Sequence, residues 1–137
     1  MLNTQLIVLC CQAAFPTLQV VYLFGSYASG DPWPNSDVDI ALLLPPKVAR
    51  QAGSLYLTSL HDQLEKALHR EADLINLRRV STVFQHEIVN TGKILYCTDE
   101  STRQEFEMLV WSFYHRLNEE RAEILADGLR TGRFYNL

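Results

Sequence analysis

Basic residues are scarce in this chain, and none precedes Lys47. The opening stretch LNTQLIVLCCQAAF is apolar like the middle of a signal peptide, but it lacks the basic residues that begin such a peptide. The whole sequence has 12 basic and 16 acidic side chains, which gives a formal net charge of −4. This balance argues against a broad basic face, so we expect no direct nucleic-acid partner.

Long apolar runs and paired cysteines are missing as well. No apolar run approaches the roughly 20 residues that a membrane-spanning helix needs, so we expect no membrane partner. The three cysteines, Cys10, Cys11 and Cys97, are odd in number and lack the spacing of a metal site. This usage is typical of a reducing compartment, and we expect the protein to reside in the cytoplasm.

The length and apolar content indicate one compact domain. A chain of 137 residues that is 47% hydrophobic can bury a sizeable core. It contains no internal repeat, low-complexity segment or linker that would divide it. We therefore predict a single domain over residues 1–137, in which residues 99–137 form a C-terminal helical extension.

Apolar periodicity and turn residues predict alternating helices and strands. Asn3 and Ser81 are suitable N-caps, and Gly25 ends the first strand. The predicted helices cover residues 4–14, 48–69, 81–89 and 99–127, where the second has a less regular start and Gly53 as its possible beginning. The predicted strands cover residues 18–24, 37–44, 71–77 and 93–97. This order predicts an α/β or α+β fold with a small mixed sheet of about four strands flanked by helices.

The most informative segment is GSYASGDPWPNSDVD, at residues 25–39. Asp37 and Asp39 open the second strand, and residues two apart in a strand point to the same side. Their carboxylates can therefore converge near Gly25 and Ser26, where backbone amides and a hydroxyl can hold phosphate oxygens. A nucleoside triphosphate carries about four negative charges, so binding it here requires divalent cations between phosphates and carboxylates.

A third carboxylate would complete such a site. Two-metal sites hold their ions about 3.5 to 4 Å apart between protein carboxylates. Asp73 is the best candidate, because it opens the third strand, which could lie beside the strand of Asp39. There Asp73 could bind the metal ion that holds the acceptor and help to take the acceptor's proton. Glu71 has the same strand parity and is the reserve for this role.

Simpler interpretations exist for each of these residues. An Asp-x-Asp at a strand start is common in turns and caps, but its combination with Gly-Ser and a later acidic strand favours metal binding. Tyr27 could stack on adenine, although ordinary packing is the better interpretation. Trp33 could contact a nucleotide, a partner or only its neighbours. Arg78 and Arg79 could reach phosphate, but a solvated turn is favoured, and the four histidines are assigned no catalytic role.

The motif resembles a known signature. Gly25-Ser26, ten further residues and Asp37-Val38-Asp39 resemble the signature of DNA polymerase beta-like nucleotidyltransferases. From about residue 18 to 97 the chain most resembles the minimal nucleotidyltransferases (MNT proteins), which are encoded beside HEPN-domain proteins and act as their antitoxins. The resemblance implies a nucleotidyltransferase fold and transfer of AMP from ATP to a hydroxyl, with two Mg²⁺ ions and release of pyrophosphate.

The resemblance also implies an acceptor and residue roles. In the antitoxin branch the acceptor is a tyrosine of the HEPN toxin, an RNase that the modification silences. Gly25 and Ser26 would bind the triphosphate, Asp37 and Asp39 would bind Mg²⁺, and Asp73 would complete the triad. The acceptor residue itself, the number of AMP units and the oligomeric state do not follow from the sequence.

Two alternatives to a protein adenylyltransferase stay open. The first is a small-molecule transferase similar to the aminoglycoside nucleotidyltransferases, which generally carry an additional substrate-binding domain for which this chain has little room. The second is an antitoxin that merely covers its toxin, but clustered aspartates serve no purpose in a pure binding protein.

The C-terminal segment has two possible roles. Its apolar stripe is expected to pack mostly on the core, while the end of the chain could dock a protein acceptor. The stripe contains Phe106, Leu109, Val110, Phe113, Tyr114 and Leu117, and the possible anchors at the end are Arg130, Arg133, Phe134 and Tyr135.

Overall fold

A computed structural model describes residues 2–30, 36–56 and 58–131, with side chains up to residue 126. The elements follow in the order α1 (Thr4–Ala14), β1 (Val20–Phe24), α2 (Ser26–Ser29), β2 (Val38–Leu43), α3 (Pro46–Ala52), α4 (Ser59–Leu68), β3 (Ala72–Asn76), the 3₁₀ turn η1 (Leu77–Arg79), α5 (Thr82–Thr91), β4 (Lys93–Cys97) and α6 (Glu100–Thr131). The predicted caps form, since Asn3 Oδ1 accepts from the Leu6 amide at 3.1 Å and Ser81 Oγ from the Phe84 amide at 3.2 Å.

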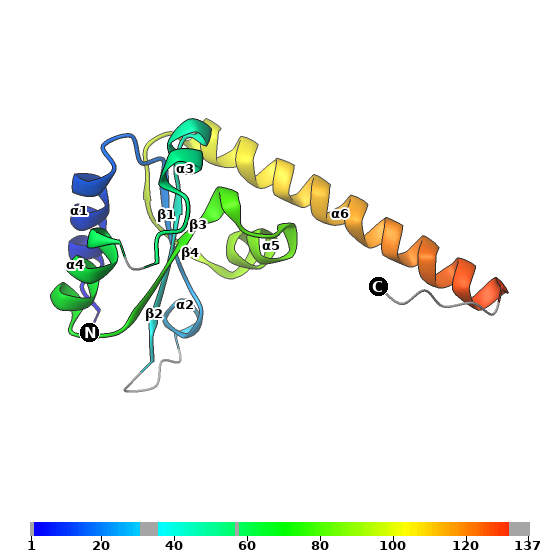
Figure 1. Ribbon diagram of the computed structural model, residues 1–137, viewed down its shortest axis with the longest axis horizontal. Coiled ribbons are helices and arrows are strands. Elements are labelled where there is room, and N and C mark those ends of the chain that lie inside the picture. Colours follow the sequence, from blue (N-terminus) through cyan, green and yellow to red (C-terminus); the bar gives the residue numbers. More distant parts are fainter. Residues whose placement is uncertain (1, 31–35, 57, 132–137) are drawn as a thin grey trace.

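The four strands form one mixed sheet in the order β3-β2-β1-β4 (Figure 1). Strand β1 pairs antiparallel with both β2 and β4, whereas β2 and β3 are parallel. The predicted fold class, a small mixed sheet flanked by helices, is confirmed. Because β2 and β3 are parallel and β1 runs the other way, the end of β1 meets the starts of β2 and β3 at one end of the sheet.

Helices cover both faces of the sheet. Side chains of β2 alternate between two apolar clusters, with Ile40 and Leu42 facing α1, α3 and α4, and Ala41 and Leu43 facing α5 and α6. In Figure 1, α1 and α4 lie on one side of the strands and α5 lies on the other. Such two-sided burial explains the nearly continuous apolar composition of β1 and β2.

The long helix predicted over residues 48–69 is wrong. The chain instead forms α3 and α4, and Gly53 between them has a φ of 62°, which few residues other than glycine adopt. Thr58 then caps α4 by accepting a hydrogen bond from the His61 amide at 3.3 Å. The periodicity misleads because apolar residues on both sides of the break, such as Ala49 and Leu64, pack into the same core. The short elements α2 and η1 were not predicted.

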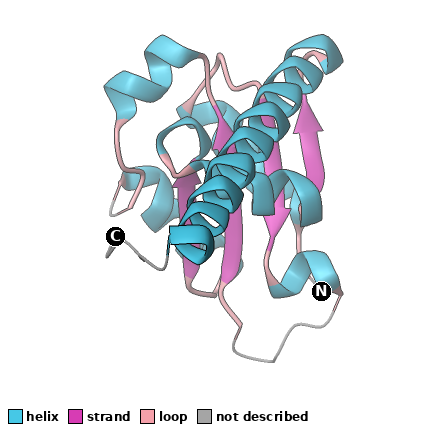
Figure 2. Ribbon diagram, turned by 90° about the vertical axis from the view of Figure 1, so that its right-hand side faces the viewer, coloured by secondary structure: helices cyan, strands magenta, loops and turns pink. Residues whose placement is uncertain are grey.

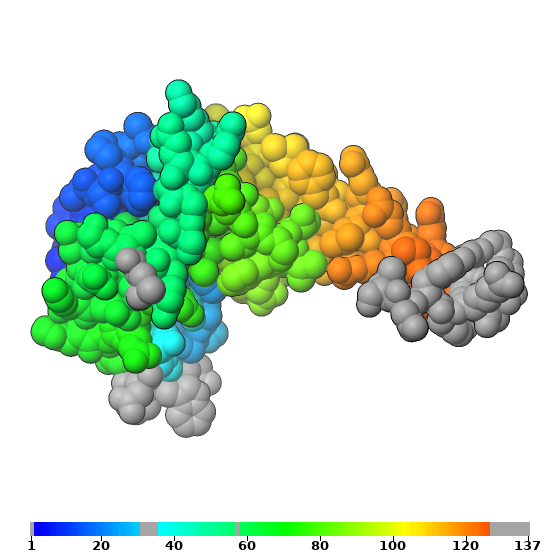
Figure 3. Space-filling model, in the orientation of Figure 1, coloured from blue at the N-terminus to red at the C-terminus, as the bar shows by residue number. Residues whose placement is uncertain are grey.

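Helix α6 is confirmed, but its predicted packing is only partly right. Phe106 and Val110 are buried against the sheet, while Leu109 and Phe113 are 51% and 48% exposed. The helix crosses in front of the sheet in Figure 2, and its later part extends away from the body in Figure 3. Residues 118–126 are all exposed. Within the described ranges, no helix is long and apolar enough to cross a membrane.

Candidate active site

The predicted site residues lie at the end of the sheet where β1 finishes and β2 and β3 begin. In the strand register, Phe24 is opposite Asp39, and Asp39 is opposite Asp73. Gly25 directly follows Phe24. Three neighbouring strands therefore place Gly25, Asp39 and Asp73 in a row, and the prediction that Asp73 lies beside Asp39 is confirmed.

Gly25 has a conformation and a position that require glycine. Its φ of 72° and ψ of −150° are costly for any residue with a Cβ. A Cβ at this position would also overlap the Asp39 carboxylate. The turn leads into α2, where the amides of Ala28 and Ser29 donate to the Gly25 carbonyl at 3.1 and 3.2 Å. Ser26, the first residue of α2, directly follows this turn.

Burial and neighbouring carboxylates control the electrostatics of Asp39. Together, partial burial, the charge of Asp73, a hydrogen bond with Asp73 and the charge of Asp37 raise the pKa of the Asp39 carboxyl to about 6. Asp37 and Asp73 are exposed. Each of these effects opposes ionisation of Asp39. A cation held between the carboxylates would reverse the balance and favour the ionised form.

The donor set fits Mg²⁺. Carboxylate oxygens are the protein ligands that this ion prefers, and it commonly uses one or two of them together with substrate phosphates. Asp37 and Asp39 flank the start of β2, and Asp73 lies beside them on β3. These three carboxylates could hold the metal, and the turn at Gly25 lies directly beside Asp39.

A second cluster of ligand-type side chains has a different task. Among the described residues, His61, Asp62 and Glu65 bring one ligand atom each within 4.8 Å of one another. Two of these groups are already bound to the backbone of β3: Glu65 Oε2 accepts from the Ala72 amide at 2.9 Å, and His61 Nε2 lies 2.7 Å from the Ala72 carbonyl oxygen. Helix α4 thus fastens the start of the edge strand, one residue before Asp73.

The remaining predicted residues have simpler roles. Glu71 is exposed, and its carbonyl accepts from the Val38 amide at 3.0 Å, so its backbone joins β3 to β2. Tyr27 packs against the core as expected, with the Arg70 guanidinium 5.8 Å from its ring centre. Trp33 lies outside the described residues.

The favoured interpretation of Arg78 as part of a solvated turn is wrong. Its guanidinium donates to the Leu44 carbonyl and, at 2.9 Å, to Gln19 Oε1, and it lies 5.3 Å from the centre of the Phe106 ring. Burial lowers the pKa of the guanidinium. Arg78 therefore joins η1 to the sheet and to α6. The neighbouring Arg79 is exposed, as predicted.

A groove that adjoins Asp73 was not predicted from the sequence. It has a volume of about 470 Å³ and lies along the outer edge of β3. Its lining residues come from the α3–α4 connection and from β3, η1 and the residue after it: Gly53, Ser54, Leu55, Tyr56, Asp73, Leu74, Ile75, Asn76, Arg79 and Val80. Gly53 was a signal in the sequence for a break at this place. The segment lines the groove because the chain forms two helices, α3 and α4, where one long helix was predicted.

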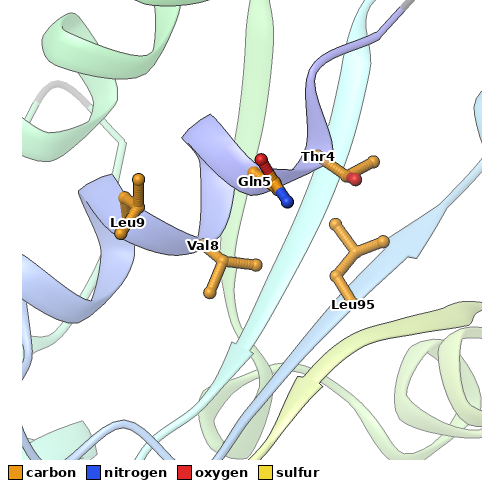
Figure 4. A pocket seen from close by; sticks show the side chains of 5 residues that line it. All are labelled: Thr4, Gln5, Val8, Leu9 and Leu95. Carbon is orange, nitrogen blue, oxygen red and sulfur yellow. The ribbon is translucent and has the colours of Figure 1, made fainter.

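Another hollow lies at the opposite edge of the sheet, between α1 and β4. It has a volume of about 330 Å³ and is lined by Thr4, Gln5, Val8, Leu9 and Leu95 (Figure 4). In Figure 4, Val8 and Leu95 face each other across it. It shares no lining residue with the aspartate cluster.

Known proteins share both the sequence and the fold. Residues 9–101 match the family "Polymerase beta, Nucleotidyltransferase". The chain is 36% identical over 126 residues to the protein adenylyltransferase MntA of Shewanella oneidensis strain MR-1, a match that covers 92% of this chain and 87% of MntA.

Solved structures agree with this match. A toxin–antitoxin crystal structure with AMP-PNP contains a chain that is 35% identical, with a TM-score of 0.76 and coverage of 93% of this chain and 99% of that chain. A structure of the tri-AMPylated Shewanella oneidensis HEPN toxin in complex with the MNT antitoxin gives 32% identity, a TM-score of 0.68 and coverage of 93% and 96%. The family match over residues 9–101 and the 36% identity to MntA show that this chain belongs to the polymerase beta nucleotidyltransferase family.

Proposed function

We propose that this chain is a protein adenylyltransferase that transfers AMP from ATP to a tyrosine hydroxyl of a HEPN-domain RNase toxin, and that it acts as the antitoxin of a type VII-like pair. The observation that carries this proposal is the row of Gly25, Asp39 and Asp73 across three adjacent strands, in a chain 36% identical to a protein adenylyltransferase. A toxin–antitoxin structure that contains a similar chain holds AMP-PNP, which supports ATP as the substrate.

Each residue of the row, and each of its sequence neighbours Ser26 and Asp37, has a proposed role. Gly25 and Ser26 hold the triphosphate, since the glycine permits close approach and Ser26 adds a hydroxyl. Asp37 and Asp39 hold Mg²⁺, and Asp73 completes the metal site. When bound, two Mg²⁺ ions would neutralise the charge of the phosphates and of the aspartates.

The chemistry is a displacement at the α-phosphorus of ATP. Asp73 orients the acceptor hydroxyl and takes its proton. The hydroxyl oxygen then forms a bond to the α-phosphorus, and the bond between that phosphorus and the bridging oxygen of pyrophosphate breaks. The products are the AMP ester of the acceptor and pyrophosphate, which leaves on the side of Gly25 and Ser26.

Helix α6 supports a protein partner. Its described part exposes large apolar side chains that a protein without partners would rarely present on one helix. They are Met108, Leu109, Trp111, Phe113, Ile124 and Leu125. We infer that residues 1–137 form one nucleotidyltransferase domain whose extension α6 contributes to toxin binding. The free thiols of Cys10, Cys11 and Cys97 are in keeping with a cytoplasmic pair.

Co-expression in cells distinguishes neutralisation by AMP transfer from neutralisation by binding alone. The HEPN-domain toxin would be expressed with the wild-type chain or with its Asp39→Asn variant, and growth and toxin binding would be measured. We expect the variant to bind the toxin but to lose neutralisation, because it cannot transfer AMP. Full neutralisation by the variant would instead show that the antitoxin acts by covering the toxin.

A further inference from the structure

The order of the strands gives the site a direction. Gly25, Asp39 and Asp73 belong to β1, β2 and β3, which are neighbours in that order. In an in-line displacement, the attacking and leaving oxygens lie on opposite sides of the phosphorus. If pyrophosphate leaves toward Gly25, as the proposed function requires, the acceptor must approach from the side of Asp73. The rest of this inference depends on that proposed function.

The groove along β3 is on this side. Asp73 is one of its lining residues, so the groove opens directly onto the aspartate cluster. Strand β3 is at the edge of the sheet in the described part of the chain, and the groove lies beyond it. Its volume of about 470 Å³ is in the range of pockets that hold specific ligands.

The far wall of the groove is held in place before any ligand binds. Asn76 Nδ2 donates to the carbonyls of Ala49 and Gly53 at 2.9 and 2.8 Å, which ties the start of this wall to β3. Leu55 is 2% exposed, and its carbonyl accepts from the Thr58 hydroxyl at 2.7 Å. A fixed wall lowers the entropy that binding must overcome.

Two side chains give the groove its chemical character. Tyr56 is 61% exposed, with its ring centre 5.3 Å from that of His61, and it offers an aromatic surface. Arg79 is exposed and offers a guanidinium on the side of η1. Tyrosine and arginine are the residue types that most often dominate the energy of protein interfaces, and a guanidinium pairs well with a carboxylate.

We infer that this groove is the acceptor site and that it binds a polypeptide segment of the toxin. The segment presents its hydroxyl to Asp73, places an apolar or aromatic side chain on Tyr56 and directs an acidic side chain to Arg79. We assign the groove to a peptide segment rather than to the adenosine of ATP, because the attacking hydroxyl must lie opposite the leaving pyrophosphate, whereas adenosine is joined to the α-phosphorus through an equatorial oxygen and has no such requirement.

The test uses the cognate HEPN-domain protein as the acceptor. Initial rates of AMP transfer would be measured for wild type, Tyr56→Ala, Arg79→Ala and the double variant, with each substrate varied in turn. Tyr56→Phe keeps the ring, and Lys93→Ala removes an exposed cation at the opposite edge strand as a matched control. Affinity for the HEPN-domain protein without Mg²⁺ and ATP provides a readout that does not depend on catalysis.

We expect the double variant to raise the KM for the HEPN-domain protein about tenfold or more and to weaken its metal-free affinity, with the KM for ATP changed less than about twofold. Tyr56→Phe and Lys93→Ala should resemble wild type. An unchanged KM and affinity for the HEPN-domain protein would overturn the acceptor site, and a raised KM for ATP would assign the groove to the nucleotide. If wild type transfers no AMP at all, the proposed function fails, while the metal-free affinities still decide whether the groove binds the HEPN-domain protein.

Discussion

At the scale of single residues, Gly25 determines both the backbone turn after β1 and the space available to Asp39. Its positive φ lets β1 turn into α2, and its missing side chain leaves room for the Asp39 carboxylate. The turn could have been predicted from the Gly-Ser pair alone. Its contact with Asp39 could not, because that contact depends on the register between β1 and β2.

Substitution of Gly25 by alanine should abolish transfer. The new Cβ would displace the Asp39 carboxylate, and a displacement near 1 Å at a reacting centre costs roughly a hundredfold in rate. Gly30→Ala is the matched control, since Gly30 also has a positive φ, of 78°, but, apart from its chain neighbours, no atom of the described residues lies within 4 Å of an added Cβ. We expect Gly30→Ala to cost about 1 kcal/mol of folding free energy and to keep its transfer rate. Equal rates for the two variants would argue against the close packing of Gly25 on Asp39.

The raised pKa of Asp39 predicts a conflict between function and stability. The pKa is about 6 in the folded chain against an ordinary value of 3.8, so the unfolded state favours the ionised form more strongly than the folded state does. Asp39 thus contributes stability below about pH 3.8, and this contribution is lost as the pH rises through about 6.

Asp39→Asn should therefore stabilise the metal-free chain at about pH 8. Because the carboxyl retains solvent contact, we expect roughly 1 kcal/mol, or about 3 °C in Tm, and a much smaller difference at about pH 4. Thermal unfolding in EDTA measures this effect. Added Mg²⁺ should stabilise the wild type more than the variant. A variant less stable than wild type at both pH values would contradict this description of the site.

Among the elements, β3 is the one whose position matters most for the site. It is an edge strand, and it carries Asp73 one residue after Ala72, whose amide and carbonyl are held by Glu65 and His61. These two polar contacts join α4 to the start of the strand. A fixed edge strand keeps Asp73 beside Asp39.

Glu65→Ala should loosen this strand. Loss of the carboxylate leaves the Ala72 amide without its partner, and we expect a cost of about 1–2 kcal/mol in the free energy of unfolding. Hydrogen exchange of the Ala72 amide should become faster. Asp62→Ala, on the same helix with a side chain 63% exposed, is the control and should leave exchange unchanged. Equal exchange in both variants would mean that Glu65 does not hold β3.

The sequence predicted these elements unevenly, for physical reasons. Strand parity predicted that Asp37 and Asp39 point to the same side, because a period of two is a property of every strand. The place of Asp73 opposite Asp39 depends on the register between β2 and β3, which parity does not determine. The division of residues 48–69 into two helices was missed, because Gly53 breaks the helix while the apolar pattern continues on both sides. The role of Arg78 was missed because Gln19 and Leu44, which it binds, are far from it in the sequence.

At the scale of the whole molecule, α6 is unusual because a long stretch of its described side chains is exposed. Phe106 and Val110 are buried near its start, but residues 118–126 are exposed throughout. An isolated helix is marginally stable in water, so this part gains its full stability only when a partner covers it.

A chain that ends after Leu117 should keep its fold and lose affinity for the toxin. We expect its Tm to change by only a few degrees, because no described residue after Leu117 is buried. Toxin affinity should fall more than about tenfold, and the full-length Ile124→Ser/Leu125→Ser variant should reproduce much of that loss. Calorimetric titration measures the toxin affinity of both variants. Unchanged affinity would show that the toxin binds elsewhere.

The most direct test of the central claim is intact-mass measurement of the HEPN-domain partner after incubation with this chain, Mg²⁺ and ATP. We predict that the partner gains mass in steps of one AMP unit, and that the gain disappears with Asp37→Asn, Asp39→Asn or Asp73→Asn. A partner that binds tightly but gains no mass, or that gains the same mass with the Asp39→Asn variant, would contradict adenylyl transfer by this aspartate cluster.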